Sequence, residues 1–344
     1  MAVEMSGPLV YVPKKGPNAS RFQTPKERKK QHKKSKTFQT ILDIVVIILV
    51  AGATYAMFKL TNVKPENQEV NNPSVVSSVS DEEPEAPAET KTGINLQPVI
   101  DSWLSLSMQG AEFGVTIIDL EDGEVVGSVN IDRKFSTASV YKLFVAYEGY
   151  RRVENGEFGG EDAAYGGYTV NECLDLMIRE SHSGCAENIA ARIGWDNLDY
   201  IIYNQYGLEN TNISSFTSTP GDVADMLELF FRHKDFSNET YAKFLDSMLN
   251  QPISDPSLCG GGRCDWRQGL PKGFTRGTKV YNKVGWDYNG AFWVIYNDAA
   301  ILEFPEQNRH FAVAVMSERL SNVNSIVQFG DMLEEAILAY ISEE

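Results

Sequence analysis

Residues 135–147 read Phe-Ser-Thr-Ala-Ser-Val-Tyr-Lys-Leu-Phe-Val-Ala-Tyr. Small and hydroxyl residues come first and an apolar run follows, which indicates a buried helix and its N-terminal turn. Ser139 and Lys142 stand three positions apart, so their side chains share one face of that helix. A serine hydroxyl needs a neighbouring base to act as a nucleophile at neutral pH. A lysine buried among apolar side chains gives up its proton more readily, so Lys142 is able to be that base.

The Ser-x-x-Lys pattern is weak by itself, because a chain of this length contains about one match by chance. Lys142 is the only lysine in the sequence that has a serine three positions before it. The catalytic interpretation therefore depends on partners supplied by other parts of the chain.

Charge is divided unevenly along the chain, whose net charge is −16. Residues 1–37 carry ten Lys or Arg against Glu4 and Glu27, a net charge of +8, so the rest of the chain carries −24. An acidic body repels phosphates, which argues against nucleic acid as a partner. The four histidines have no metal-ligand spacing, and no glycine-rich phosphate loop follows a strand. We predict no metal site and no cofactor.

An apolar segment at residues 41–58, with Asp43 as its only charge, is just long enough to cross a bilayer core. A buried core helix would not be flanked by a basic run and a polar tail, and a cleaved signal peptide has a shorter charged leader. We therefore predict an uncleaved signal anchor at residues 38–59. Because basic residues stay on the cytoplasmic side, residues 1–37 should be cytoplasmic and the C-terminal domain extracellular, in a single-pass membrane protein.

Residues 60–94 are rich in Asn, Ser, Pro and acidic residues and cannot bury a core. We predict a disordered linker there and one folded domain over residues 95–344.

The four cysteines all lie in that domain, which agrees with export to an oxidising compartment. Cys259 and Cys264 enclose a glycine-rich loop that is flexible enough to close a small disulfide ring. Cys173 and Cys185 are a second candidate pair, or stay reduced and buried. Four cysteines allow three pairings, and the sequence does not choose between them.

Strand patterns occur only towards the two ends of the domain. Residues 113–120 and 125–130 flank a turn and indicate a hairpin, and later strands are expected at 281–284, 292–304 and 310–316. Helical patterns occupy residues 96–108, 139–154, 170–180, 184–193, 196–206, 220–232 and 323–341. We predict an α+β fold: one antiparallel five-stranded sheet built from both chain ends, with terminal helices on one face and a helical insertion on the other.

Two further segments supply candidate partners for Ser139. Ser181 lies in a turn between two expected helices, where it is able to pass a proton between Lys142 and a leaving group. Lys283 ends a strand and can hold a substrate carboxylate, and Gly285 lets substrate backbone approach that edge.

The backbone amides of Ser139 and Trp286 are candidate donors to an oxyanion. His182 suggests a serine–histidine pair with Ser181, but adjacent side chains point apart, so His182 is the weaker candidate for the base.

These segments together resemble the serine β-lactamase and penicillin-binding-protein superfamily, and they are nearest to its class A β-lactamases. The first motif, Ser-x-x-Lys, matches at Ser139 and Lys142. The second, Ser-Asp-Asn, falls on residues 181–183 as Ser-His-Ser, and the third, Lys-Thr-Gly, on residues 283–285 as Lys-Val-Gly. An intact Lys-Thr-Gly at residues 91–93 precedes the domain and is interpreted as a chance match.

The resemblance covers about residues 95–344 and implies a β-lactamase/transpeptidase-like fold that performs acyl transfer. Ser139 would attack the carbonyl of a β-lactam or of a peptidoglycan D-Ala-D-Ala stem peptide. Lys142 would activate Ser139, Ser181 would transfer the proton, and Ser183 and Lys283 would bind the substrate.

The departures from the family pattern bear on the subclass. Class A β-lactamases carry a glutamate, in a Glu-x-x-Leu-Asn loop, that activates the deacylating water. Residues 190–215 have no such motif, and Glu209 is the only candidate. We predict a membrane-anchored serine hydrolase that hydrolyses β-lactams. The alternatives are a D-Ala-D-Ala carboxypeptidase or penicillin-binding protein, a degenerate non-catalytic wall-binding module, and a hydrolase of another amide or ester.

Overall fold

The structure is a computed structural model that describes residues 93–107, 110–251, 265, 267–288, 293–319 and 322–342. The expected basic segment, the signal anchor and the linker up to residue 92 lie outside these residues, as do Cys259 and Cys264. Within the described part, no helix is both long and apolar enough to span a bilayer.

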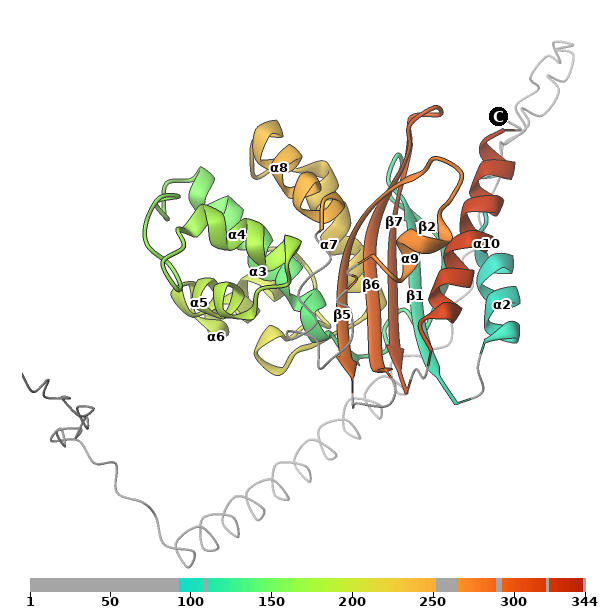
Figure 1. The fold of residues 1–344 in the computed structure, drawn as a ribbon, viewed down its shortest axis with the longest axis horizontal. Coiled ribbons are helices and arrows are strands. Elements are labelled where there is room, and N and C mark those ends of the chain that lie inside the picture. Colours follow the sequence, from blue (N-terminus) through green and yellow to red (C-terminus); the bar gives the residue numbers. More distant parts are fainter. Residues whose placement is uncertain are drawn as a thin grey trace, which may run out of the picture. The chain divides into compact units, whose positions relative to one another are not determined.

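Five antiparallel strands form the central sheet in the order β2-β1-β7-β6-β5 (Figure 1). They are β1 Glu112–Asp119, β2 Glu124–Val129, β5 Lys279–Tyr288, β6 Trp293–Phe304 and β7 Arg309–Glu318. The first two come from the beginning of the domain and the other three from its end, which confirms the predicted sheet. β5 is longer than the expected 281–284, because the long strand β6 offers it a ladder partner along its whole length.

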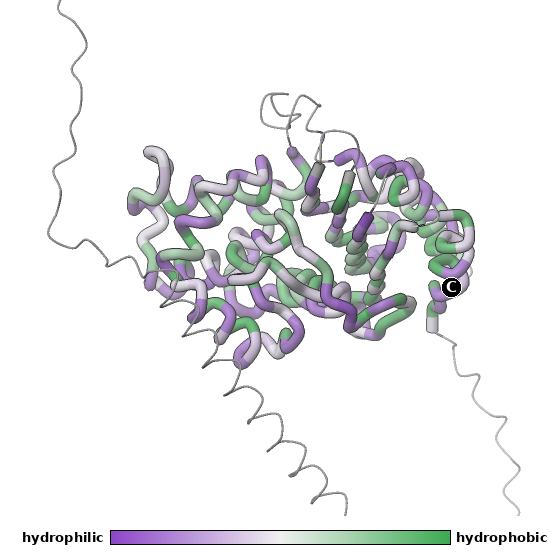
Figure 2. Tube along the Cα trace, turned by 90° about the horizontal axis from the view of Figure 1, so that it is seen from below, coloured by the Kyte–Doolittle hydropathy of each residue, from purple (hydrophilic) through white to green (hydrophobic). Residues whose placement is uncertain are grey.

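Two terminal helices cover one face of the sheet, α2 (Gln97–Leu106) and α10 (Asn324–Ile341), as expected (Figure 1). The Trp103 ring packs between those of Phe113 and Phe329, at centroid distances of 4.6 and 4.5 Å. The Trp103 indole N–H also donates a hydrogen bond of 2.7 Å to the Ser325 carbonyl, so the large ring is buried without an unpaired donor. Hydrophobic and hydrophilic residues alternate along the helices (Figure 2), as amphipathic packing requires.

The helical insertion lies on the other side of the sheet (Figure 1). Its helices are α3 Tyr141–Glu154, α4 Val170–Arg179, α5 Ser183–Ile193, α6 Trp195–Asn204, α7 Pro220–Arg232 and α8 Asn238–Leu249. α7 packs against β1, β6 and β7, and Thr219 caps its N-terminus by accepting a hydrogen bond from the Asp222 amide. Every one of these helices except α8 was predicted.

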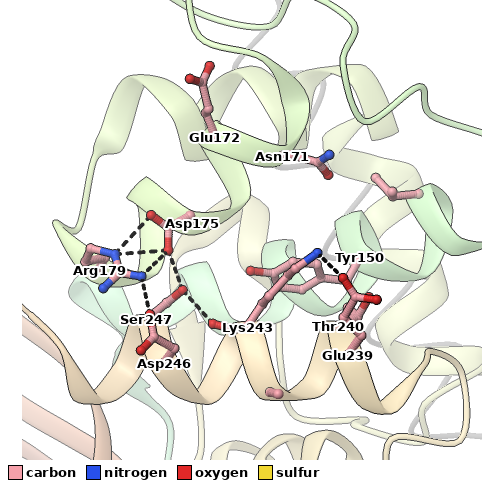
Figure 3. A pocket seen from close by; sticks show the side chains of 12 residues that line it. Tyr150, Asn171, Glu172, Asp175, Arg179, Glu239, Thr240, Lys243, Asp246 and Ser247 are labelled. Atoms are coloured by element: carbon pink, nitrogen blue, oxygen red, sulfur yellow. Dashed lines mark hydrogen bonds and ion pairs between the residues drawn. The ribbon is translucent and has the colours of Figure 1, made fainter.

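Helix α8 was missed although its sequence carries two signals. Ser237 caps it by accepting from the Thr240 amide, and Phe244 and Met248, one turn apart, are buried. A cavity of about 690 Å³ lies between α4 and α8 (Figure 3). At one end of this cavity Arg179 connects Asp175 of α4 with Asp246 of α8.

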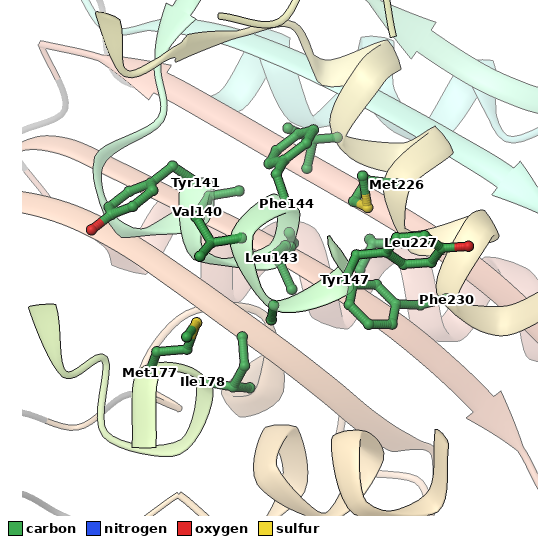
Figure 4. Close-up of a cluster of buried hydrophobic side chains, with 14 of the residues drawn as sticks. Val140, Tyr141, Leu143, Phe144, Tyr147, Met177, Ile178, Met226, Leu227 and Phe230 are labelled. Atoms are coloured by element: carbon green, nitrogen blue, oxygen red, sulfur yellow. The ribbon is translucent and has the colours of Figure 1, made fainter. Parts of the chain in front are cut away.

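Helix α3 is the centre of the insertion, and residues 141–150 are all buried. Figure 4 shows its apolar side chains surrounded by those of α4 and α7. The first ten residues of α3 have no solvent face, so the lysine in its first turn is buried with its neighbours.

Helix α3 begins later than the predicted residue 139. A 3₁₀ turn, η1 (Ala138–Val140), precedes it, and Ala138 adopts a left-handed φ of +42° that a regular helix does not allow. Before that turn a two-residue strand, β3 (Phe135–Ser136), pairs with β4 (Thr217–Ser218). This strand pair is too short to be recognised from sequence.

Edge strand β5 lies directly against η1 at Gly285. A Cβ atom at this position would be 2.5 Å from the Thr137 carbonyl oxygen and 2.8 Å from the Ser139 amide nitrogen. The sequence suggested that Gly285 makes room for substrate, whereas in the structure the atoms next to it belong to the protein's own backbone. Gly285 is therefore required for strand β5 to approach Ser139.

Replacing Gly285 with Ala should push β5 away from η1. Overpacking of this kind costs about 1–3 kcal/mol, so the thermal midpoint should fall and the reactivity of Ser139 with it. Differential scanning calorimetry measures the first effect. The control is Gly93→Ala, where an added Cβ meets only the Glu124 carboxylate at 4.0 Å. Equal midpoints for the two variants would contradict this account of the contact.

Candidate active site

Ser139 and Lys142 lie next to each other at the start of the insertion's buried helix, although Ser139 precedes α3 instead of beginning it. Ser139 is half-buried in η1, and Lys142 is fully buried in the first turn of α3. The Lys142 Nζ lies 2.8 Å from the Ser139 Oγ, a direct hydrogen bond. The predicted contact across one helical turn is present.

Ser181 and Ser183 bring a second segment to the same amine. The Lys142 Nζ donates to the Ser181 carbonyl at 2.7 Å and lies 3.2 Å from both the Ser181 and the Ser183 hydroxyls. Ser181 has a left-handed φ of +56°, which turns its backbone towards the lysine between α4 and α5. Hydroxyls that are far from Ser139 in sequence thus converge on one nitrogen.

Lys283 approaches from the sheet. Its Nζ is 2.9 Å from the Ser181 Oγ and donates to the Val284 carbonyl at 2.9 Å. The Ser181 hydroxyl therefore lies between the two lysine amines, in contact with both. This is the position that a proton-transferring group needs.

Burial controls the charge of both lysines. It lowers the pKa of Lys142 to about 7, against an opposing effect of the Glu187 carboxylate. For Lys283, burial and the neighbouring charge of Lys142 hold the pKa well below its usual value, although Asp298 acts in the opposite direction. A substantial fraction of Lys142 is thus a free amine at neutral pH, which is the form that can accept the Ser139 proton.

His182 does not take part in this cluster. Its Nδ1 accepts a hydrogen bond of 3.1 Å from the Cys185 amide and caps α5, and its ring packs against Tyr165 and Tyr168. The serine–histidine alternative is therefore not supported.

A disulfide between Cys173 and Cys185 joins α4 to α5. The bond spans 12 residues, and the enclosed segment contains Ser181 and Ser183. Both cysteines are fully buried. This bond is one of the candidate pairs from the sequence, and it closes the turn that carries the two serines.

Asn297 on β6 is a site residue to which the sequence assigned no role. Its side-chain amide donates to the carbonyls of Ser136 and Thr137 at 2.8 and 3.1 Å, and its Oδ1 accepts from the Ser317 amide at 2.9 Å. It thereby fixes the segment before Ser139 to the sheet. The available signal was a polar amide within an apolar strand, which must be hydrogen-bonded if it is buried.

Arg179 supports Ser181 from the other side of the insertion. Its guanidinium forms a pair of hydrogen bonds to Asp175 and one to Asp246 at 2.8 Å (Figure 3). It also donates to the Asn250 carbonyl at 3.0 Å. Arg179 lies only two residues before Ser181. Its bonds to Asp246 and Asn250 therefore tie the turn that carries Ser181 to helix α8. The cavity beside them is lined by neither Ser139 nor Lys142.

Glu209 and Trp286 are two further residues that the sequence singled out. Glu209, the candidate for the deacylation base, is exposed on the loop after α6. Trp286 follows Gly285 on β5, and its ring packs near Tyr296 at a centroid distance of 5.8 Å. The oxyanion role of its amide stays a prediction.

Comparison with known proteins gives a family match. The sequence matches the model of the β-lactamase enzyme family over residues 95–341. A comparison with curated proteins finds no match.

Three solved structures illustrate the similarity of the fold. PBP-A has 19% sequence identity and a TM-score of 0.60, over 71% of this chain and 97% of PBP-A. A PBP-A variant in an acyl-enzyme complex with penicillin G has 19% identity and a TM-score of 0.57, over 70% and 97% of the two chains. A class A β-lactamase from Bacteroides cellulosilyticus has 14% identity and a TM-score of 0.59, over 72% and 100%.

The sheet, the insertion and the serine–lysine centre define a serine hydrolase of the β-lactamase and penicillin-binding-protein superfamily. Within it, the chain belongs to the β-lactamase enzyme family.

Removing the disulfide by Cys173→Ala together with Cys185→Ala should destabilise the domain by about 3 kcal/mol, as expected for a loop of this length. Acylation should also slow, because the turn that carries Ser181 is released. Denaturant unfolding measures the effect by comparing the oxidised parent with the variant and with the parent under reducing conditions. If the variant and the reduced parent have the same unfolding midpoint as the oxidised parent, the bond contributes nothing to stability.

Proposed function

We propose that this protein opens β-lactams by forming an acyl-enzyme on Ser139 and then hydrolyses that intermediate. The observation that carries the proposal is the hydrogen bond of 2.8 Å between Ser139 and a buried lysine whose pKa is about 7. A nucleophile and a neutral base in direct contact are the minimum that acyl transfer needs.

Lys142 and Ser181 can supply the proton transfers that the acylation of Ser139 requires. The Lys142 amine accepts the Ser139 proton while the Ser139 oxygen attacks the lactam carbonyl. The carbon–nitrogen bond then breaks: the Lys142 ammonium gives its proton to the Ser181 oxygen while the Ser181 hydroxyl proton passes to the lactam nitrogen, which restores the free amine. The Ser139 amide, at the N-terminal turn that leads into α3, is a candidate donor to the oxyanion.

Lys283 and Ser183 are the residues that would bind the substrate. A substrate carboxylate next to Lys283 would favour its ammonium form, which burial otherwise disfavours. Ser183 and Val284 stand where the family motifs have Asn and Thr, and each lost side-chain hydrogen bond is worth about 1 kcal/mol. We therefore expect weaker binding of β-lactams than a complete set of motifs would give.

A penicillin-binding protein that acts on peptidoglycan stem peptides is the second candidate. It is favoured by the loop after α6, which has no glutamate motif and whose only candidate, Glu209, is exposed. A long-lived acyl-enzyme would follow from such a loop. The similarity to PBP-A, a variant of which forms an acyl-enzyme with penicillin G, agrees with this candidate.

We further propose that the protein is held at the outer face of the cell membrane by residues 38–59. The support comes from the sequence: an apolar segment preceded by ten basic residues. A non-catalytic wall-binding module is less well supported, because such a module has no need of a lysine buried against a serine hydroxyl.

Mixing the protein with penicillin G should produce an adduct whose mass increase equals the whole penicillin, since ring opening loses no atom. Intact-protein mass spectrometry over time measures its formation and its decay. Hydrolysis predicts an adduct that disappears, whereas a persistent adduct would favour the penicillin-binding protein. Ser139→Ala should give no adduct, and an adduct at parental yield in that variant would exclude Ser139 as the nucleophile.

The acylation rate should rise with pH through about 7 and then level off, because only the free amine of Lys142 accepts a proton. Below that pH the ammonium form predominates and acylation slows about tenfold per pH unit. Labelling with a fluorescent penicillin over a series of buffers gives the profile. A rate that is independent of pH through this range would show that Lys142 is not the base.

A further inference from the structure

A second cavity, of about 430 Å³, lies beside helix α7 and is lined by none of the residues of the serine–lysine centre. Its wall comes from α3, from the loop after α6, from α7 and from the segment that follows α7. Leu208, Leu229 and the Tyr206 ring give it apolar surface, and the Tyr206 hydroxyl donates to the buried Glu148 carboxylate. A cavity of this size and lining can hold a small organic molecule.

Two of the carboxylates in this wall already have partners within the protein. Glu228 accepts a hydrogen bond of 2.8 Å from the Arg232 guanidinium, one helical turn away on α7. Asp235 accepts one of 2.6 Å from the Tyr147 hydroxyl of α3. These groups are satisfied without a ligand.

Asp225 and Lys234 line the same cavity without such a partner. Neither forms a hydrogen bond or an ion pair with any residue that the structure describes, and they do not pair with each other. Partial burial of its carboxylate, and then the like charges of Asp222 and Glu228, raise the pKa of Asp225 to about 6. A carboxylate in contact with a cation would show the opposite shift. The cavity therefore has one unpaired negative group and one unpaired positive group, which are too far apart to form an ion pair.

The larger cavity, between α4 and α8, differs in this respect. Its two cations are both paired with carboxylates: Arg179 with Asp175 and Asp246, and Lys243 with Glu239. An ionic ligand would have to displace these contacts. The smaller cavity is the one whose wall has both signs of charge available to a ligand.

A ligand of the smaller cavity has to satisfy both groups. A molecule that carries only a cation would be repelled by Lys234, and one that carries only an anion would be repelled by Asp225. An amino acid carries an ammonium and a carboxylate on the same carbon atom, so it can contact two protein groups that are too far apart to pair. An apolar side chain on that carbon matches the surface of Leu208 and Leu229.

We propose that the cavity beside α7 binds an apolar α-amino acid, with the ammonium group at Asp225 and the carboxylate at Lys234. The side chain lies against the apolar part of the wall. This inference does not rest on the proposed acylation, because neither Ser139 nor Lys142 lines the cavity.

Isothermal titration calorimetry of the full-length protein tests the proposal with L- and D-phenylalanine. Two analogues keep the same ring: phenethylamine lacks the carboxylate, and 3-phenylpropionate lacks the ammonium. At pH 7.5 the tighter-binding enantiomer should bind about tenfold more tightly than either analogue, because each analogue loses one charge-assisted contact. If neither enantiomer shows saturable binding, or if one analogue binds as tightly as phenylalanine, the proposal is wrong.

Two variants separate the contacts, and both change exposed residues, so the thermal midpoint should stay the same. Asp225→Asn should weaken phenylalanine about tenfold and remove its advantage over 3-phenylpropionate. Lys234→Met should remove its advantage over phenethylamine. The matched control is Glu335→Gln, a charge change on α10 at a side chain that is 75% exposed, and it should leave all affinities unchanged. Variants of Asp225 and Lys234 that keep the parental preference among the three molecules would contradict the assignment.

The affinity for phenylalanine should also depend on pH. Below about 6 a growing fraction of Asp225 is protonated and loses its attraction for the ammonium, so binding should weaken as the pH falls from 7.5 to 5. In Asp225→Asn this dependence should vanish, which separates Asp225 from His233, a neighbour in sequence that lines no part of the cavity. An affinity that is constant over this range in the parent protein would exclude Asp225 as the ammonium contact.

Discussion

The structure depends on an amine placed in a protein interior. Lys142 sits in the first turn of a helix that is buried on every side, where a charged ammonium is disfavoured and every N–H needs an acceptor. The acceptors are hydroxyl and carbonyl oxygens from η1 and from the turn between α4 and α5. The fold must therefore bring these two segments, distant in sequence, to within hydrogen-bond distance of one nitrogen.

Four separate restraints accomplish this convergence. The Cys173–Cys185 disulfide closes the turn that carries Ser181, and Arg179 fastens the same turn to α8. On the opposite side, Asn297 holds the backbone before Ser139 against the sheet, and Gly285 allows β5 to come close to the Ser139 amide. None of the four uses the hydroxyl of Ser139 or of Ser181.

The arrangement of charges accounts for the chemistry better than any single residue does. Lys142 and Lys283 flank the Ser181 hydroxyl. Burial favours the neutral form of both lysines, and the charge of Lys142 adds to this effect on Lys283. Under the proposed function, a substrate carboxylate next to Lys283 would favour its ammonium form, and Ser181 is the hydroxyl that contacts both lysines.

Local pattern determined a large part of this protein. The three-residue spacing of Ser139 and Lys142 is set by helix geometry, and alternation and turn residues indicated five strands from the two ends of the domain; both are confirmed. Only the tertiary structure revealed why Gly285 is a glycine and what Asn297 holds. Sequence spacing fixes which side chains are neighbours within one element, because the backbone repeat is regular. Contacts between elements follow from how whole helices and strands pack, and no local repeat encodes that.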